Sequence, residues 1–229
     1  MGKENIPGNL ILELKNPEVR SRILERGKEL VEFVKKSNFE TLVFIDRSAR
    51  PISWIFDEFW IKLFPDEAKP ESIFINLGQK DLRKKYMKGL GSAMSTMGNQ
   101  FVGLYDTEEN IALFKQRLRS DKDAGLQLHR ELGAEGEEKL RSRKVLIIDE
   151  SEFEGVSRLF AEEIIDEVFT PLSIEYWEWG GHDWPYDIPT GLSEKKRDSS
   201  FIAKPAKRLA NIALFQMARN EITSIASEL

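Results

Sequence analysis

Two polar turns contain the residue types in this chain best suited to binding a polar ligand. The first turn, residues 46–50 (DRSAR), follows the apolar run 42–45, and the second, which opens with Asp149 and Glu150, follows the apolar run 145–148. Continuous apolar runs without alternation are typical of parallel strands buried on both faces. Ligands of such sheets bind beyond the carboxyl ends of the strands, so we expect both turns on a ligand-binding edge.

Each turn is followed by a segment with helical periodicity. Apolar residues recur every three or four positions behind Pro51 and again behind Gly155. Stripes at this spacing are far more often the face that packs on a sheet than a ligand site. Both regions therefore predict a strand, a loop and a helix. The stripe residues are Ile52, Ile55, Phe56, Phe59 and Leu63 in the first helix, and Val156, Leu159, Phe160, Ile164 and Val168 in the second.

The remaining segments complete an α/β pattern. Asn16 followed by Pro17 predicts a capped N-terminal helix. Further strands are expected at 72–76, 100–105 and 172–177, with two charged helices inside 107–143 and a closing helix from about Pro205. The predicted fold class is therefore α/β and Rossmann-like, with a mostly parallel sheet and helices on both faces. Right-handed crossovers should place Asp46 and Asp149 on the same edge.

Composition narrows the classes of partner. At 229 residues with a net charge of −5, the chain suits one substantial domain and has no whole-molecule attraction to nucleic acid. No apolar run approaches the roughly 20 residues that span a bilayer, and the N-terminus lacks a signal-peptide pattern, so we expect no membrane partner. The absence of Cys excludes disulfides and thiolate sites and fits a cytoplasmic location.

The second turn resembles a known motif. The segment VLIIDESEFEGVS is similar to the phosphoribosyl-pyrophosphate motif of type I phosphoribosyltransferases, in which a buried strand and two adjacent acids precede a loop ending in Thr-Gly-Gly-Thr. The order of other parts also matches that family. Its pyrophosphate loop corresponds to 46–51, its flexible catalytic loop to 77–99 and its base-contacting hood to 177–191. The resemblance covers most of residues 41–179.

This resemblance implies a role for each candidate residue. Asp149 and Glu150 would accept hydrogen bonds from the ribose hydroxyls and act in catalysis, while the loop and the helix N-terminus would hold the 5′-phosphate. Mg²⁺ would bridge ligand oxygens, with no protein ligand assigned to it. The other implied ligand-binding residues are Arg47, Ser48, Ala49 and Arg50 for pyrophosphate, Ser151, Gly155 and Ser157 for phosphate, Lys84 and Lys85 in the lid, and Trp179, His182 and Trp184 in the hood.

The function implied by the resemblance is binding of a phosphoribosyl or nucleotide ligand, with transfer of a phosphoribosyl group to or from a base. The chain would form a single phosphoribosyltransferase-like domain with an N-terminal helical extension (1–40), a lid and helical insertion (78–143), and a hood and closing helix (178–229). A homodimer is also in keeping with this resemblance.

The phosphate loop departs from the family, which leaves alternatives open. Glu154 replaces the first Thr, Glu152 precedes it, and Val156 replaces the second Gly. Carboxylates beside a phosphate oppose binding through like-charge repulsion, and Val is excluded from Gly-only backbone geometries. A non-catalytic protein of the same fold that binds a nucleotide or a protein partner remains an alternative. A different sugar phosphate or phosphate ester is a third.

Several candidates also have structural readings. Arg47 is as consistent with a local salt bridge to Asp46 as with phosphate binding, and the basic cluster 80–88 is equally typical of a solvated face. The hood aromatics fit either stacking on a base or filling the end of the core. A P-loop is absent from the sequence, which argues against a P-loop ATPase, and two His far apart argue against a transition-metal site at His182.

Overall fold

A computed structural model describes residues 14–45, 49–75, 108–120, 132, 136–149, 156–180 and 205–229. The chain forms two compact units. One contains residues 1–38, 47–69 and 182–229, and the other contains residues 39–46 and 70–181. We call the first the helical unit and the second the sheet unit. The prediction of a single phosphoribosyltransferase-like domain stays a prediction.

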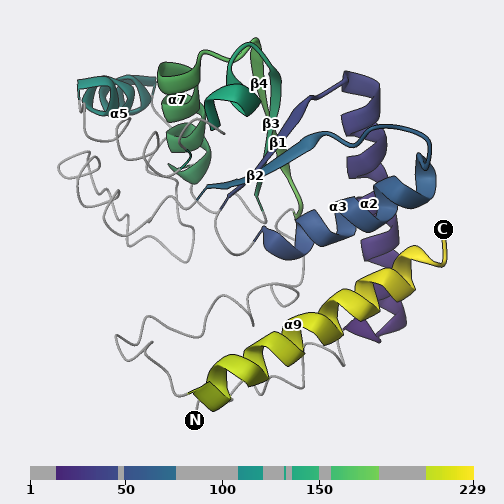
Figure 1. The fold of residues 1–229 in the computed structure, drawn as a ribbon. Helices are drawn as coiled ribbons and strands as arrows, with labels where there is room; N and C mark the ends of the chain where they lie inside the picture. The colour runs from purple at the N-terminus through teal and green to yellow at the C-terminus, as the bar shows by residue number, and fades with distance from the viewer. Residues whose placement is uncertain are drawn as a thin grey trace, which may run out of the picture. The chain divides into compact units, whose positions relative to one another are not determined.

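The sheet unit is built on four parallel strands, β1 (Thr41–Ile45), β2 (Glu71–Ile75), β3 (Lys144–Asp149) and β4 (Ser173–Glu178) (Figure 1). Their order across the sheet is β2-β1-β3-β4. The predicted α/β class and parallel sheet are therefore confirmed. All four predicted core strands are present, and the bounds of each agree with the prediction to within one residue.

The two central strands are buried over their apolar runs, residues 42–45 and 145–148, which explains why these runs are unbroken. Side chains alternate between the two faces of a strand, so a strand buried on both faces is apolar along its middle, and the buried polar residues Thr41 and Asp149 lie at strand ends. On one face the strands pack beneath α5 (Glu108–Ser120) and α7 (Val156–Phe169) in a single cluster of buried residues. This cluster includes Val43, Ile45, Val145, Ile147, Phe114, Leu118, Ile164 and Ile165. The opposite face, with Leu42, Phe44, Leu146 and Ile148, is fully buried as well.

A buried carboxylate joins the two helices of the sheet unit. The side chain of Glu163 on α7 is only 7% exposed and forms ion pairs with Lys115 and Arg119 of α5. Arg119 Nε donates to the Glu163 carboxylate at 3.2 Å, and its Nη2 lies 3.0 Å from the same oxygen. Both cations come from one helix and the carboxylate from the other, so this charge cluster fixes α5 against α7 alongside the apolar contacts.

The amino-terminal edge of the sheet is closed by hydrogen bonds around Glu40. Its carboxylate accepts from Arg143 Nη1 at 2.7 Å and from the Lys144 N–H at 3.2 Å. The main chain of Glu40 also bonds to both flanking strands, through Lys144 O at 3.0 Å and the Glu71 N–H at 3.0 Å. The Arg143 hydrogen bond, followed by the Lys144 N–H, holds the pKa of Glu40 below its usual value. One residue thus ties together the starts of three strands.

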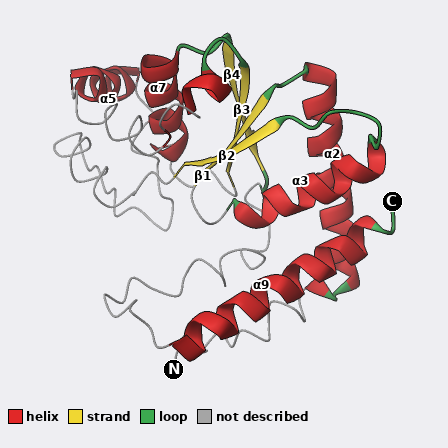
Figure 2. Ribbon diagram, in the orientation of Figure 1, coloured by secondary structure: helices red, strands yellow, loops and turns green. Residues whose placement is uncertain are grey.

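The helical unit contains α2 (Pro17–Ser37), α3 (Arg50–Leu63) and α9 (Pro205–Ala226) (Figure 2). Asn16 Oδ1 accepts from the Glu18 N–H at 2.9 Å, so the predicted cap of α2 is confirmed. The helix ends at Ser37 and is capped by Asn38, whose φ of 54° is the left-handed conformation common just after helices.

Close contact between α2 and α3 requires a glycine. A Cβ atom built on Gly27 would lie 2.5 Å from Cε1 of Phe59, so any larger residue there would displace the ring. The predicted start of the closing helix at Pro205 is also confirmed. No helix in the described part of the chain is long and apolar enough to cross a membrane. The strand expected at 100–105 lies outside the described residues.

Candidate functional site

The strand order creates a topological switch point between β1 and β3. From β1 the chain passes to β2 on one side, and it later returns to β3 on the other side of β1. The two strands are parallel and paired from Thr41 with Val145 to Phe44 with Ile148, so their carboxyl ends lie side by side. In open α/β sheets the crevice beyond such a switch point is the usual ligand-binding place. These are the two strands whose following turns were singled out from the sequence.

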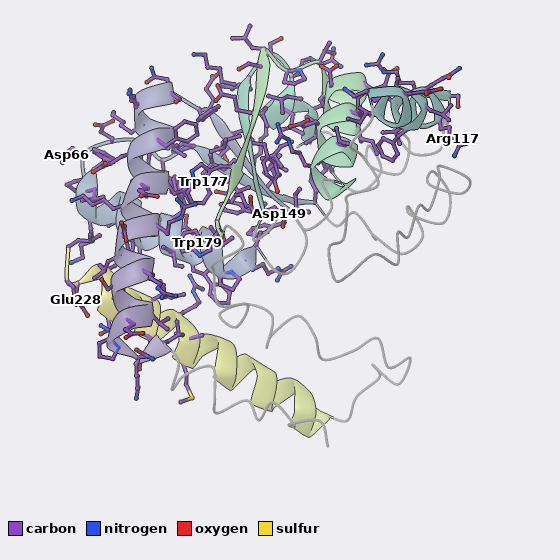
Figure 3. The ribbon with its side chains drawn as sticks, turned by 180° about the vertical axis from the view of Figure 1, so that it is seen from behind. Asp66, Arg117, Asp149, Trp177, Trp179 and Glu228 are labelled. Atoms are coloured by element: carbon purple, nitrogen blue, oxygen red, sulfur yellow. The ribbon has the colours of Figure 1, made fainter. Side chains whose placement is uncertain are left out.

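Asp149 is the site residue that the structure describes most fully. It is the last residue of β3 and only 5% exposed, and its carbonyl oxygen accepts from the Trp179 N–H at 2.9 Å. That hydrogen bond extends the ladder between β3 and β4 by one residue past the end of β4. Figure 3 shows Asp149 with Trp177 and Trp179 at the carboxyl ends of these strands. The backbone that carries the Asp149 carboxylate is therefore held by its pairing with β4, while the pairing of β3 with β1 ends one residue earlier, at Ile148.

Glu178 is a neighbour of Asp149 that the sequence interpretation missed. The two residues are register partners in the parallel ladder, and so are Ile147 and Tyr176 before them. Ile147 belongs to the core cluster beneath α7, and Tyr176 packs against that cluster. Because side chains alternate along a strand, Asp149 and Glu178 face the α7 side as well. An acid at the end of a predicted strand was a visible signal, but its pairing with Asp149 depends on tertiary register.

The indoles at this edge belong to the other face. Trp177 is the register partner of Ile148, which places it on the face opposite to Asp149. The Trp177 and Trp179 rings contact each other edge-on, with centroids 5.8 Å apart, and Trp179 is 1% exposed. Trp179 is therefore a core residue in this structure, in line with the reading in which hood aromatics fill the end of the core. A ligand that touches both an acid and an indole would have to cross the strand ends.

A guanidinium lies on the same face as the two acids. Arg158, near the start of α7, has its guanidinium carbon 4.9 Å from the centroid of the Tyr176 ring. Its Nε also donates to the Glu162 carboxylate at 2.8 Å. This stacking and pairing hold a delocalised cation beside β4. The α7 face thus carries the carboxylates of Asp149 and Glu178 at the strand ends, and the guanidinium of Arg158 lies beside β4.

Of the first polar turn, residues 46–50, the structure describes only Ala49 and Arg50. Ala49 is buried and Arg50 is exposed at the first turn of α3, in the helical unit. The Ala49 carbonyl accepts from the Ser53 N–H at 3.1 Å, and the Arg50 carbonyl accepts from Ser53 Oγ at 2.7 Å. Ala49, the N-cap residue of α3, makes no side-chain capping hydrogen bond. The exposure of Arg50 is compatible with the predicted phosphate contact and does not test it.

Most of the other predicted site residues fall outside the described part of the chain. Among the predicted candidates, the structure brings together Asp149 and Trp179, and the side chain of Ser157 on α7 is not described. The lid and the phosphate loop, with their assigned residues, are not described either. The undescribed candidates are Arg47, Ser48, Lys84, Lys85, Glu150, Ser151, Gly155, His182 and Trp184.

A protein-held metal centre has no support in the described ranges, where no group of three or more acidic, His or Cys side chains is arranged to bind an ion. The expectation that Mg²⁺ binds through ligand oxygens stays a prediction. Comparison with protein-family models, curated proteins and solved structures gave no match to this chain.

Proposed function

We propose that this chain is a phosphoribosyltransferase-like protein that binds a phosphoribosyl or nucleotide ligand and transfers a phosphoribosyl group to or from a base. One observation carries the proposal. The switch point of the sheet falls between β1 and β3, the same two strands that the sequence connects to ligand-binding turns. This position supports the proposal, because ligands of open α/β sheets bind in the crevice beyond such a switch point.

The chemistry assigned to the site follows from its donors and acceptors. Asp149 and Glu150 accept hydrogen bonds from the ribose hydroxyls, and their charge offsets the positive charge that develops on the sugar ring. The N-terminus of α7 presents N–H groups to the 5′-phosphate. Mg²⁺ would neutralise the leaving pyrophosphate through the ligand's own oxygens. Arg47 and Arg50 are proposed to bind that leaving group through charge-assisted hydrogen bonds.

A second candidate function is retained because of one sequence feature. Glu152, Glu154 and Val156 stand in the loop that would hold the phosphate, where acids repel it and Val restricts the backbone. These substitutions favour a protein of the same fold that binds a nucleotide or a partner without catalysis. The two functions share the Asp149 site and differ in the affinity for a 5′-phosphate.

A thermal-shift panel tests the proposal. The purified chain is heated with phosphoribosyl pyrophosphate, with nucleoside monophosphates and with pyrophosphate, each with Mg²⁺. We expect phosphoribosyl compounds to raise the melting temperature through binding to the folded state. A chain that responds to none of them would contradict the proposal. If only the variant with Glu154→Thr and Val156→Gly responds, the non-catalytic function is correct.

A further inference from the structure

Glu163 is a buried carboxylate of α7 with a cation beside each of its two oxygens. Lys115 pairs with Oε1, while Arg119 reaches Oε2 with Nε at 3.2 Å and with Nη2 at 3.0 Å. The two cations are four residues apart on α5, so they lie one turn apart on the same side of that helix. A single carboxylate of α7 therefore contacts two successive turns of α5.

The burial of this charge cluster is uneven. The side chain of Glu163 is 7% exposed, whereas those of Lys115 and Arg119 are 37% and 55% exposed. The cations keep part of their hydration, so most of the cost of desolvation falls on the carboxylate. Replacing buried ions by apolar residues of similar volume is often neutral or stabilising, whereas removing the partners of a buried ion leaves its charge uncompensated. A gain in stability therefore does not explain why an acid occupies this position.

Apolar contacts already attach α5 to the sheet unit. Phe114 and Leu118 of α5 belong to the same buried cluster as Ile164 and Ile165 of α7, and among the described elements α5 packs chiefly on α7. Attraction between apolar surfaces is non-directional, so small rotations and shifts of one helix over the other change its free energy little. The hydrogen bonds and ion pairs of Glu163 depend on distance and angle, so they form in one placement of the two helices.

We propose that Glu163 is a conformational device that selects a single placement of α5 on α7 and adds no net stability to the fold. With the carboxylate present, only the observed placement compensates its charge. Without it, α5 stays attached through its apolar contacts and samples several placements. Selection of register is the best-attested role of buried polar groups between helices. This inference concerns the packing of two helices and does not depend on the proposed function.

Urea denaturation of the purified full chain tests the claim about stability. We expect Glu163→Met, which is apolar and similar in size, to keep the wild-type midpoint or to raise it. The double variant Lys115→Met with Arg119→Met leaves the carboxylate buried without these cations, so its midpoint should fall by about 1 M urea or more. The matched control is Glu162→Met, because the ion pair of Glu162 with Arg158 lies within α7 and should change the midpoint little.

Spin-label distances test the claim about placement. The sequence contains no Cys, so the substitutions Glu109→Cys on α5 and Glu167→Cys on α7 introduce the only thiols, both at exposed positions. Pulsed electron spin resonance then measures the distribution of distances between the two helices. We expect a narrow distribution with Glu163 in place and with the Glu162→Met control. Glu163→Met should give a broader or split distribution, and so should Glu163→Gln, which keeps the shape and removes the charge.

Each measurement has an outcome that would overturn the inference. If Glu163→Met lowers the midpoint as much as the double variant does, or fails to fold while Glu163→Gln folds with a narrow distribution, Glu163 is a stabilising ion pair. If both Glu163 variants keep the narrow distribution, the apolar contacts set the placement of α5. If Glu162→Met broadens the distribution equally, any lost charge on α7 has this effect and Glu163 has no special role.

Discussion

The two edges of the sheet use charged residues in opposite ways. At the amino-terminal edge, Glu40 is paired with Arg143 and hydrogen-bonded to the backbone of both neighbouring strands. At the carboxyl-terminal edge, Asp149 and Glu178 place two acids side by side on one face. The first arrangement satisfies its charges within the fold and stabilises it. The second places two acids in register on neighbouring strands, where like charges oppose pairing unless other groups compensate them.

The largest effect should come from the core that both edges share. Ile147 is fully buried in the cluster beneath α7, midway between the two edges. We expect Ile147→Ala to lower the free energy of unfolding by about 2–5 kcal/mol, because it removes buried methyl groups and leaves a cavity. Urea denaturation measures this loss. Ile61→Ala, at a position that is 61% exposed, is the control and should cost far less. Equal losses would mean that the assigned core is wrong.

Asp149→Asn should separate ligand binding from stability. The substitution keeps the shape of the side chain and removes one of the two adjacent negative charges. We expect the affinity for ribose 5-phosphate to fall at least tenfold while the free energy of unfolding changes by less than about 1 kcal/mol. Titration calorimetry and urea denaturation measure the two quantities. A variant that loses several kcal/mol of stability but keeps its affinity would place Asp149 with the structural residues of the opposite edge.

Glu40→Gln should show the reverse pattern. The substitution weakens the hydrogen bonds that join β1 to Arg143 and Lys144, while the backbone bonds of the residue remain. Because the Glu40 side chain is 41% exposed, we expect a loss of only about 0.5–1 kcal/mol of stability. Affinity for ribose 5-phosphate should not change, since the residue lies at the other edge. A tenfold loss of affinity would contradict the division of roles between the edges.

The smallest predicted effect is a pH dependence. The hydrogen bond from Arg143 lowers the pKa of Glu40 in the folded state, so the unfolded chain binds this proton more readily. The stabilisation is therefore fully present above the usual value of 4.5 and is lost as pH falls below it, through the folded pKa. We expect wild type and Glu40→Gln to differ in melting temperature at pH 7 and to converge near pH 3. A difference that grows on acidification would refute this assignment.

Local sequence patterns were sufficient to predict these strands and helices and to predict that β1 and β3 end at the same edge of the sheet. The apolar runs of β1 and β3, the Asn16 cap and the proline-led starts of α2 and α9 were all predicted correctly. Each depends on interactions between residues close in sequence, or on a strand whose two faces are both apolar. The same logic predicted that both central strands would end at one edge, which the parallel pairing confirms.

The partners of the site residues could not be predicted in this way. Glu178 meets Asp149 only because β3 and β4 pair with one particular register, and a shift of one residue would have turned Glu178 to the Trp177 face. The ion pairs of Glu163 join α7 to Lys115 and Arg119 of α5, and no local sequence pattern specifies how these two helices pack together. Trp179 was a candidate for ligand stacking, and only its burial shows that it packs in the core.

By itself, the sequence determined which segments form strands and helices and where the polar turns fall, because propensity, capping and periodicity act over short distances. Tertiary structure alone decided the strand order β2-β1-β3-β4. This order places the switch point between β1 and β3, the two strands that the polar turns follow. It also decided that Asp149 and Glu178 are neighbours and that the Trp179 indole is buried in the core. The physical reason is that strand pairing and helix docking are selected by the packing of the whole core, to which each side chain contributes only a small part.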